Sequence, residues 1–133
     1  MKTIEKIIET RGGVEHLKRS PIKFKNEGYM DLMVEWIGVG PRGCPLISVA
    51  MYYLQNGDPM RDPDLVFEFF PPTGKWMPVS FRNDGLGIDQ VAVWKDGDRL
   101  ITNGVLVADL EEFAKTWDRD LGIQGFIEAA RKQ

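Results

Sequence analysis

The chain of 133 residues carries 17 Lys and Arg against 20 Asp and Glu, and 43% of its residues are hydrophobic. This composition is too apolar for a disordered chain and predicts a single folded domain, because two cores would each be barely large enough to offset conformational entropy. A formal charge of −3 provides no positive field for a phosphate backbone, so nucleic-acid binding is disfavoured. The single cysteine excludes an intrachain disulfide and a cysteine-rich zinc site.

The first nine residues mix charges into their apolar positions and contain neither the apolar core nor the cleavage site of a signal peptide. No stretch approaches the roughly 20 apolar residues that a membrane helix needs. We therefore expect a soluble, cytoplasmic protein without a membrane partner.

Isoleucines recur at helical spacing between positions 4 and 8, behind Thr3, a residue type that caps helices. The glycine pair at positions 12 and 13 should end this helix, and a shorter helical segment should follow until Pro21. Residues 1–20 are thus predicted to form an N-terminal helical segment.

Residues 22–103 read as an antiparallel sheet, because apolar runs rich in β-branched and aromatic residues alternate with turn signals. The dipeptide Asn56-Gly57 is the clearest of these signals, since it favours a tight hairpin turn. We expect four to six strands in meander order. The predicted strands are residues 22–25, 29–37, 46–55, 65–70, 76–82 and 88–95.

From about Leu106 the apolar period changes to about 3.6 residues, which predicts helices over residues 106–131, with Gly122 and Gly125 dividing them. The predicted fold class is therefore α+β, an antiparallel β-meander sheet with N-terminal and C-terminal helices packed on one face. The stripe expected to pack on the sheet consists of Leu110, Phe113, Ala114, Trp117 and Leu121.

Gly38-Val-Gly-Pro-Arg-Gly43 matches the G-x-G-x-x-G pattern of dinucleotide-binding loops and follows a predicted strand. Such a loop must open a helix whose N-terminus holds the pyrophosphate. Here Cys44-Pro45 leads into a strand instead. We predict a glycine-rich connection between strands that binds no nucleotide.

Neither His16 nor Cys44 indicates a catalytic centre. His16 is the only histidine and lies in a lysine-rich stretch far from Cys44 in sequence, which favours a surface residue over a general base. Cys44 lies beside Pro45 with Arg42 nearby, and we expect a structural thiol that is buried or half-buried.

The best candidate for a binding site is a charged turn after the strand 46–55. Asn56, Asp58, Arg61 and Asp62 fall within seven positions, and the preceding paired tyrosines should point to opposite faces of the sheet. The alternative is a structural corner, in which Asp58 and Asp62 cap turns and Arg61 pairs with one of them. The candidate binding residues are Tyr52, Tyr53, Asn56, Asp58, Arg61 and Asp62.

Acidic residues in the same region allow a second reading, a metal-dependent hydrolase or nuclease. Carboxylates that converge can hold Mg²⁺ or share a proton. The acidic set comprises Asp58, Asp62, Asp64 and Glu68, although the lysine expected two positions after Glu68 is missing. Convergence of these carboxylates would favour the enzyme, and their dispersal would favour a binding module.

Three motifs together resemble a family of small bacterial proteins catalogued only as a domain of unknown function and often associated with plasmids and integrative elements. They are Pro45-Leu-Ile-Ser-Val-Ala-Met-Tyr-Tyr-Leu-Gln-Asn-Gly-Asp-Pro-Met-Arg-Asp-Pro63, Arg82-Asn-Asp-Gly-Leu-Gly87, and Phe113-Ala-Lys-Thr-Trp-Asp-Arg119 leading to Gln124-Gly-Phe126. The resemblance covers roughly residues 22–127 and implies no activity. Met51 stands where the family pattern has a histidine, so any chemistry of that histidine should be absent here.

Taken from the sequence alone, the leading hypothesis is a small interaction or ligand-binding module, an accessory protein of a mobile element. Its partner would be an unidentified protein or small ligand. No catalytic constellation is visible, so a non-enzymatic role is favoured, and we expect no cofactor and no bound metal.

Overall fold

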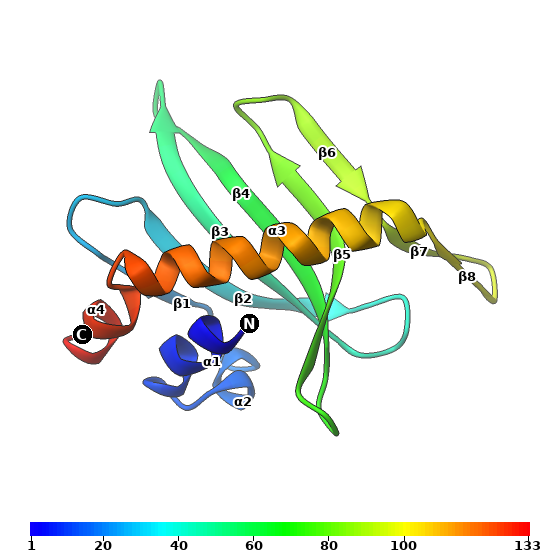
Figure 1. Ribbon diagram of the computed structural model, residues 1–133, viewed down its shortest axis with the longest axis horizontal. Coiled ribbons are helices and arrows are strands. Elements are labelled where there is room, and N and C mark those ends of the chain that lie inside the picture. The colour runs from blue at the N-terminus through cyan, green and yellow to red at the C-terminus, as the bar shows by residue number, and fades with distance from the viewer.

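Six antiparallel strands follow one another across a sheet in the computed structural model, which describes all of residues 1–133 (Figure 1). A separate two-stranded hairpin projects from one side of the sheet, and four helices complete the fold. The sheet strands are β1 (Ile22–Phe24), β2 (Asp31–Val39), β3 (Pro45–Gln55), β4 (Asp58–Phe70), β5 (Lys75–Asn83) and β6 (Ile88–Val91). The other elements are β7 (Val93–Asp96), β8 (Arg99–Thr102), α1 (Lys2–Glu9), α2 (Val14–Leu17), α3 (Gly104–Ile123) and α4 (Phe126–Arg131).

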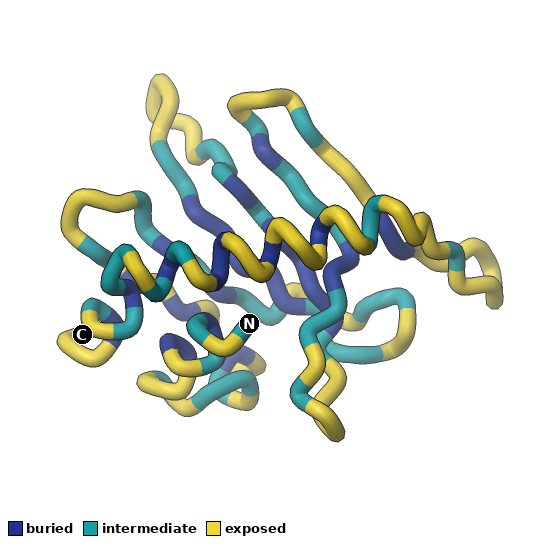
Figure 2. Tube along the Cα trace, viewed as in Figure 1, coloured by how far each residue is buried: buried dark blue, intermediate teal, exposed yellow.

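The helices lie on one face of the sheet, which confirms the predicted α+β class. Helix α3 runs diagonally across the strands, and the buried positions lie where this helix and the sheet meet (Figure 2). None of the four helices combines the length and apolar character needed to span a membrane. The core joins Ile4, Ile7 and Ile8 of α1, Leu110, Ala114, Trp117 and Leu121 of α3, and Leu32, Val34, Ile47, Val49, Leu65 and Phe67 of the sheet.

Phe113 is a correction to the predicted stripe, because 38% of its surface remains exposed. Its ring lies at the margin of the helix–sheet contact, edge-on to Phe81 with ring centroids 5.0 Å apart. It also contacts Trp117. The helical period placed Phe113 on the correct side of α3 without telling how far the sheet extends beneath it.

Thr3 does not cap α1, contrary to the sequence prediction. The cap residue is Met1, and Thr3 lies in the first helical turn. The free N–H groups of Thr3 and Ile4 donate to the buried carboxylate of Asp118, at 3.1 and 3.0 Å. A side chain of α3 therefore satisfies the start of α1.

Strand β4 begins at Asp58, seven residues before the predicted strand. Its first half pairs with β3 alone, and pairing with β5 begins at Asp64. Pro59 and Pro63 therefore lie where the strand has a free edge and no donor to β5 is required. In the sequence, the two prolines argue against a strand. In the structure, they lie in the part of β4 that pairs with only one other strand, β3.

The predicted strand 88–95 is divided in the structure. Strand β6 ends at Val91, Ala92 is fully buried, and β7 begins at Val93 in a different sheet. The backbone N–H of Ala92 donates to Val79 and its carbonyl accepts from Asn103, which anchors the point where the chain leaves the main sheet.

The face of the six-stranded sheet opposite the helices is called the open face below. Pairing across the strands places one row of residues on it, because paired residues of antiparallel strands share a face. Successive pairs in this row join Lys23 to Met33, Ala50, Asp64, Arg82 and Asp89. The row is mostly polar and charged, in contrast to the apolar face beneath α3.

Candidate functional site

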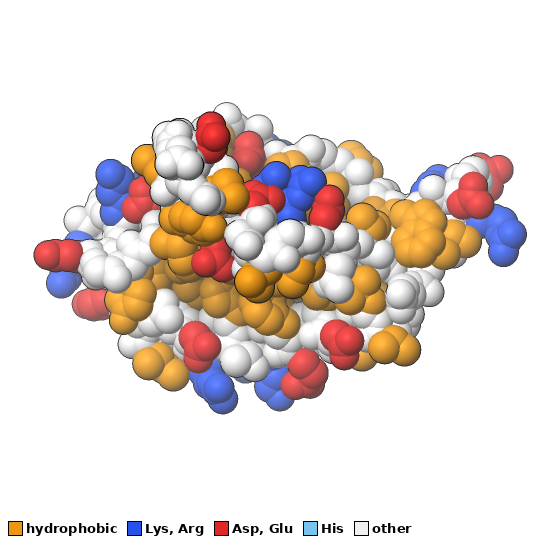
Figure 3. Space-filling model, turned by 90° about the horizontal axis from the view of Figure 1, so that it is seen from above, with side chains coloured by type: hydrophobic (Ala, Val, Ile, Leu, Met, Phe, Trp, Pro, Cys, Tyr) orange, Lys and Arg blue, Asp and Glu red, His pale blue; other side chains and the backbone are white.

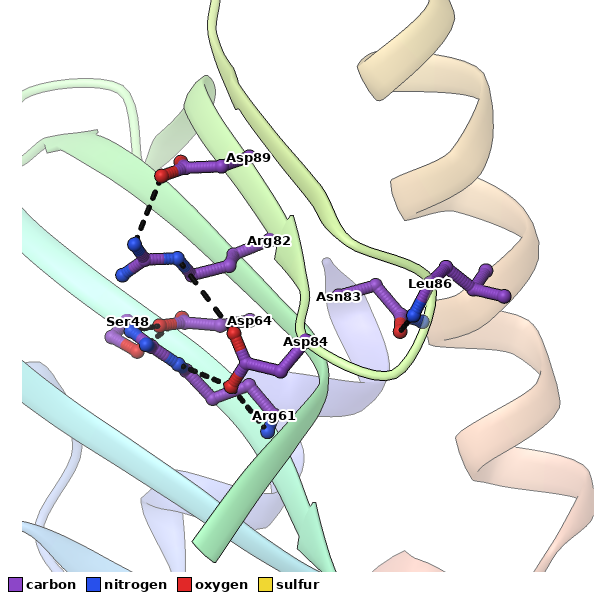
Figure 4. A network of polar contacts seen from close by, with 8 residues as sticks. All are labelled: Ser48, Arg61, Asp64, Arg82, Asn83, Asp84, Leu86 and Asp89. Carbon is purple, nitrogen blue, oxygen red and sulfur yellow. Dashed lines mark hydrogen bonds and ion pairs between the residues drawn. The ribbon is translucent and has the colours of Figure 1, made fainter.

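Arginines and carboxylates form a network on the open face where β4, β5 and the turn after β5 meet (Figure 4). The Nε of Arg61 and the backbone N–H of Arg61 both donate to Oδ2 of Asp84, at 3.0 and 2.9 Å. The backbone N–H of Asp84 donates in return to the carbonyl of Arg61. Arg82 lies 3.8 Å from the other Asp84 oxygen and 2.9 Å from Asp89. The network therefore ties β4 to β5, β6 and the intervening turn.

The hydrogen bonds within this clamp favour the charged forms of both partners. Donation from the backbone and the guanidinium of Arg61 lowers the pKa of Asp84. The hydrogen bond to Asp84 raises the pKa of Arg61. Both side chains are partly exposed, which limits what their attraction adds to stability.

Asp64 lies beneath the network in a different electrostatic environment. Its Oδ1 accepts a hydrogen bond of 2.6 Å from the hydroxyl of Ser48, and Arg61 Nη1 lies 4.0 Å from its other oxygen. Burial raises the pKa of Asp64, and the hydrogen bond and the arginines only partly oppose this effect. The charged form of Asp64 is therefore held at a net electrostatic cost.

Tyr52 borders the same network, because it pairs with Arg61 across β3 and β4. Its pKa is raised by burial and then by the charge of Asp64. Tyr52 also lines a pocket of about 430 Å³ that opens beside the network. The other lining residues are Lys23, Asp31, Met33, Tyr53, Leu54 and Pro59. This volume and apolar lining are typical of a small-ligand site.

The predicted binding residues separate into three groups. Tyr52 and Arg61 meet at the network, as just described. Tyr53 and Asp62 contact the turn after β5 instead. The amide of Asn83 donates to Asp62 at 2.9 Å, and a Cβ at Gly85 would lie only 2.5 Å from the Tyr53 hydroxyl.

The third group lies at the tip of the β3–β4 hairpin. Asn56 and Gly57 adopt positive φ angles of 53° and 84°, which produce the tight turn expected of this dipeptide. Asn56 and Asp58 are exposed, and neither side chain forms a hydrogen bond. Arg61 pairs with Asp84 rather than with Asp58 or Asp62, so its partner comes from the turn after β5 and not from its own hairpin.

The four carboxylates of the hydrolase hypothesis do not converge. Asp58 is at the exposed tip, Asp62 binds Asn83, Asp64 binds Ser48, and Glu68 is enclosed by a loop. No group of three or more His, Cys, Asp or Glu side chains has an arrangement suited to a metal ion. By the criterion set out from the sequence, this dispersal favours the binding module.

Glu68 explains the glycine pattern of residues 38–43. The loop between β2 and β3 folds over its fully buried side chain. Glu68 accepts hydrogen bonds from the backbone N–H groups of Arg42 and Cys44, at 2.9 and 3.2 Å, and from the Arg42 guanidinium at 3.0 Å. A Cβ at Gly40 would lie 2.2 Å from Glu68 Cγ. The loop therefore encloses a carboxylate of its own chain and, as predicted, leads into a strand.

Four residues of the network were missed by sequence reasoning, namely Ser48, Arg82, Asp84 and Asp89. Arg82-Asn83-Asp84 was visible only as a turn signal and as one of the motifs that carry the family resemblance. Asp84 lies 23 positions from Arg61, its partner. No local pattern connects residues so far apart, so only the strand register could have found the pair.

Fold and site together define a small α+β domain with helices on one face of a meander sheet and a charged network on the other. The chain belongs to the family described as a domain of unknown function, DUF6908, whose model matches residues 2–127. No curated protein and no solved structure matches the chain.

Proposed function

We propose that this protein is a binding module that recognises its ligand with the open face of the sheet, at the pocket bordered by Tyr52. The observation that carries the proposal is the position of this pocket. It has apolar walls, and one of its lining residues, Tyr52, pairs with Arg61 of the charged network. Apolar area with a few placed polar groups is the usual composition of a recognition site.

A larger pocket of about 690 Å³ lies between α1, α3 and the β4–β5 hairpin, and it is a weaker candidate. Its lining is mainly charged and polar, with Lys2, Lys75 and Lys115 at its rim. Its buried carboxylate, Asp118, already accepts hydrogen bonds from the first turn of α1. A central polar residue of this helix-side pocket therefore has a structural role.

The electrostatics of Asp64 give independent support. Folding alone would be served better by a neutral residue at this position, since burial disfavours the charge. Groups that are retained against stability are characteristic of functional surfaces. The charge of Asp64 beside Tyr52 fits a ligand or partner segment that presents a hydrogen-bond donor.

The partner is an unidentified protein or small ligand, and the finer role is an accessory function of a mobile element in the cytoplasm. The plasmid association that the family resemblance implied motivates this part of the proposal. Genes adjacent to this one would be the first place to look for the partner.

Affinity capture from the native host tests the proposal. Tyr52→Ala should lose a partner that the wild type captures, because the substitution removes the ring that borders the pocket. Tyr29→Ala is a matched control, since Tyr29 is a half-exposed aromatic residue outside the pocket. Thermal melts of both variants should stay close to the wild type. Equal capture by wild type and Tyr52→Ala would refute the proposed site.

A further inference from the structure

The two edges of the six-stranded sheet are treated differently. At the β1 edge, the residue that follows the strand is bound by Gln133, whose side-chain amide accepts from the N–H of Lys25 at 3.0 Å and donates to its carbonyl at 2.7 Å. The β6 edge has no such cover in the sheet order. It also lacks the lysine, proline or bulge with which proteins protect free edges. Its only charge, Asp89, is paired with Arg82.

The register fixes which backbone groups of β6 are free. Ala92 donates its N–H toward Val79 of β5 at 2.7 Å. Because N–H and C=O directions alternate along a strand, Gln90 also faces β5, whereas Asp89 and Val91 turn their backbone groups outward. The free edge therefore offers two N–H and C=O pairs, separated by one residue.

We propose that a second copy of this chain pairs with β6 in antiparallel orientation, so that two sheets join into one. The register places Asp89 opposite Val91 of the second copy, with the two Gln90 residues facing each other on the two-fold axis. Each outward N–H then meets an outward carbonyl. This register also keeps like charges apart.

Neighbouring registers are less favourable. A shift of two positions in one direction places Asp89 opposite Asp89 of the second copy, and like charges directly across a strand pair destabilise it. A shift in the other direction opposes the two Val91 residues and leaves Asp89 opposite Val93, which has already turned into β7. A shift of one position would pair inward with outward backbone groups.

The β7–β8 hairpin supplies further surface for the same partner. It projects past the β6 edge (Figure 1), and the space-filling view has it standing out from the body of the molecule (Figure 3). Trp94 is 42% exposed and Leu100 is 47% exposed on this hairpin. The two-fold axis brings each hairpin toward the β5–β6 turn of the other copy, where Leu86 is 73% exposed. Apolar groups thus flank the polar strand pair on both sides.

Sedimentation over about two decades of protein concentration tests the proposal with a pair of charge variants. Val91→Lys places a lysine opposite Asp89 of the second copy and should retain the dimer. Val91→Asp opposes two carboxylates and should give a monomer with an unchanged circular dichroism spectrum. Both variants remove the same apolar side chain and introduce charges of opposite sign. A wild type that stays monomeric throughout, or two variants that dissociate equally, would overturn the proposal.

A disulfide provides a second readout of the register. Residues that face each other in a non-hydrogen-bonded antiparallel pair have Cα atoms about 4.5 Å apart, within the range that a disulfide spans. Gln90→Cys in a Cys44→Ser background should therefore form a covalent dimer under mild oxidation, and Asp96→Cys at the hairpin tip should form much less. Equal cross-linking at both positions would contradict the register.

Discussion

Glu68 and Asp64 lie on the same strand and on the same face of the sheet, four positions apart, yet they differ in every respect that bears on function. Glu68 is covered by a glycine-containing loop, and backbone N–H groups of this loop donate hydrogen bonds to its carboxylate. Asp64 has one hydroxyl as its close partner and lies near Tyr52, which lines an open pocket. The Glu68 side chain is fully buried, whereas the Asp64 side chain keeps 13% of its surface exposed.

The two carboxylates differ in how far their charge stabilises the fold. The donors around Glu68 are backbone groups and Arg42, so the charge holds a loop in place. Asp64 carries a raised pKa, which means that burial costs more than its partners return. One end of the open face is therefore structural, and the proposed binding role is confined to the other end.

Removing the sealed carboxylate should have the largest effect. Glu68→Ala leaves the N–H groups of Arg42 and Cys44 without their acceptor and opens a cavity, so we expect a loss of about 3 kcal/mol in unfolding free energy. Glu68→Gln keeps the size and one acceptor oxygen and should lose clearly less. Chemical denaturation measures the stability of both variants. Equal stability of Glu68→Ala and wild type would contradict a structural role for the contact between Glu68 and the loop.

The Arg61–Asp84 clamp should contribute less, and its two sides should differ. Asp84→Ala removes the acceptor for both the backbone and the guanidinium of Arg61 and should cost about 2 kcal/mol, whereas Arg61→Ala leaves the backbone bond and should cost about 1 kcal/mol. Thermal melts give the order. A reversed order would mean that the backbone bond to Asp84 contributes nothing.

The same clamp has a defined pH dependence. Because the folded pKa of Asp84 lies below the unfolded value of about 3.9, its contribution is complete above that value and is lost as the pH falls through the folded pKa. The stability difference between wild type and Asp84→Ala should therefore shrink in acid. A difference that is constant from neutral pH to strong acid would be inconsistent with a lowered pKa.

Asp64→Asn should have a smaller effect of opposite sign. Its raised folded pKa favours the protonated form, so its contribution is present below the unfolded pKa and is lost as the pH rises through the folded pKa. An asparagine keeps an acceptor for Ser48 without the charge, and at neutral pH it should raise the melting temperature by about 1 to 3 °C. Ligand capture should weaken in the same variant. A lower melting temperature would place Asp64 among the structural residues.

For nucleotide binding by the glycine-rich loop between β2 and β3, we expect no effect at all. Titration calorimetry with ATP and with NAD should give no binding heat, because the glycine-rich loop is filled by Glu68 and followed by a strand. Gly40→Val is a poor control for this experiment, since its side chain would clash with Glu68. Micromolar affinity in the wild type would overturn the assignment of the loop.

The features predicted correctly from the sequence are those that depend on residues close together in the chain. The turn at Asn56-Gly57 and the helical stripe of α3 are local patterns, and the structure contains both, with Phe113 as the exposed member of the stripe. The early start of β4 was missed because a proline is tolerated or forbidden according to the presence of a neighbouring strand, which the sequence does not display.

The site was predictable only in part for the same reason. Tyr52 and Arg61 face each other across one hairpin, close to its turn, so a local reading found both. Asp84 and Arg82 arrive through the next hairpin, and Arg42 reaches Glu68 over 26 positions. Whether a carboxylate is sealed or open depends on such distant partners, which is the very property that distinguishes Glu68 from Asp64.

The most direct test of the account is residue-resolved NMR of the wild type titrated with a fragment library of small aromatic and amine compounds. We predict that binding fragments shift the amide resonances of Met33, Tyr52 and Leu54, which line the open-face pocket, and that Tyr52→Ala abolishes these shifts. Shifts confined to the residues around Lys75 and Lys115 in the helix-side pocket, or their persistence in Tyr52→Ala, would contradict recognition by the open face.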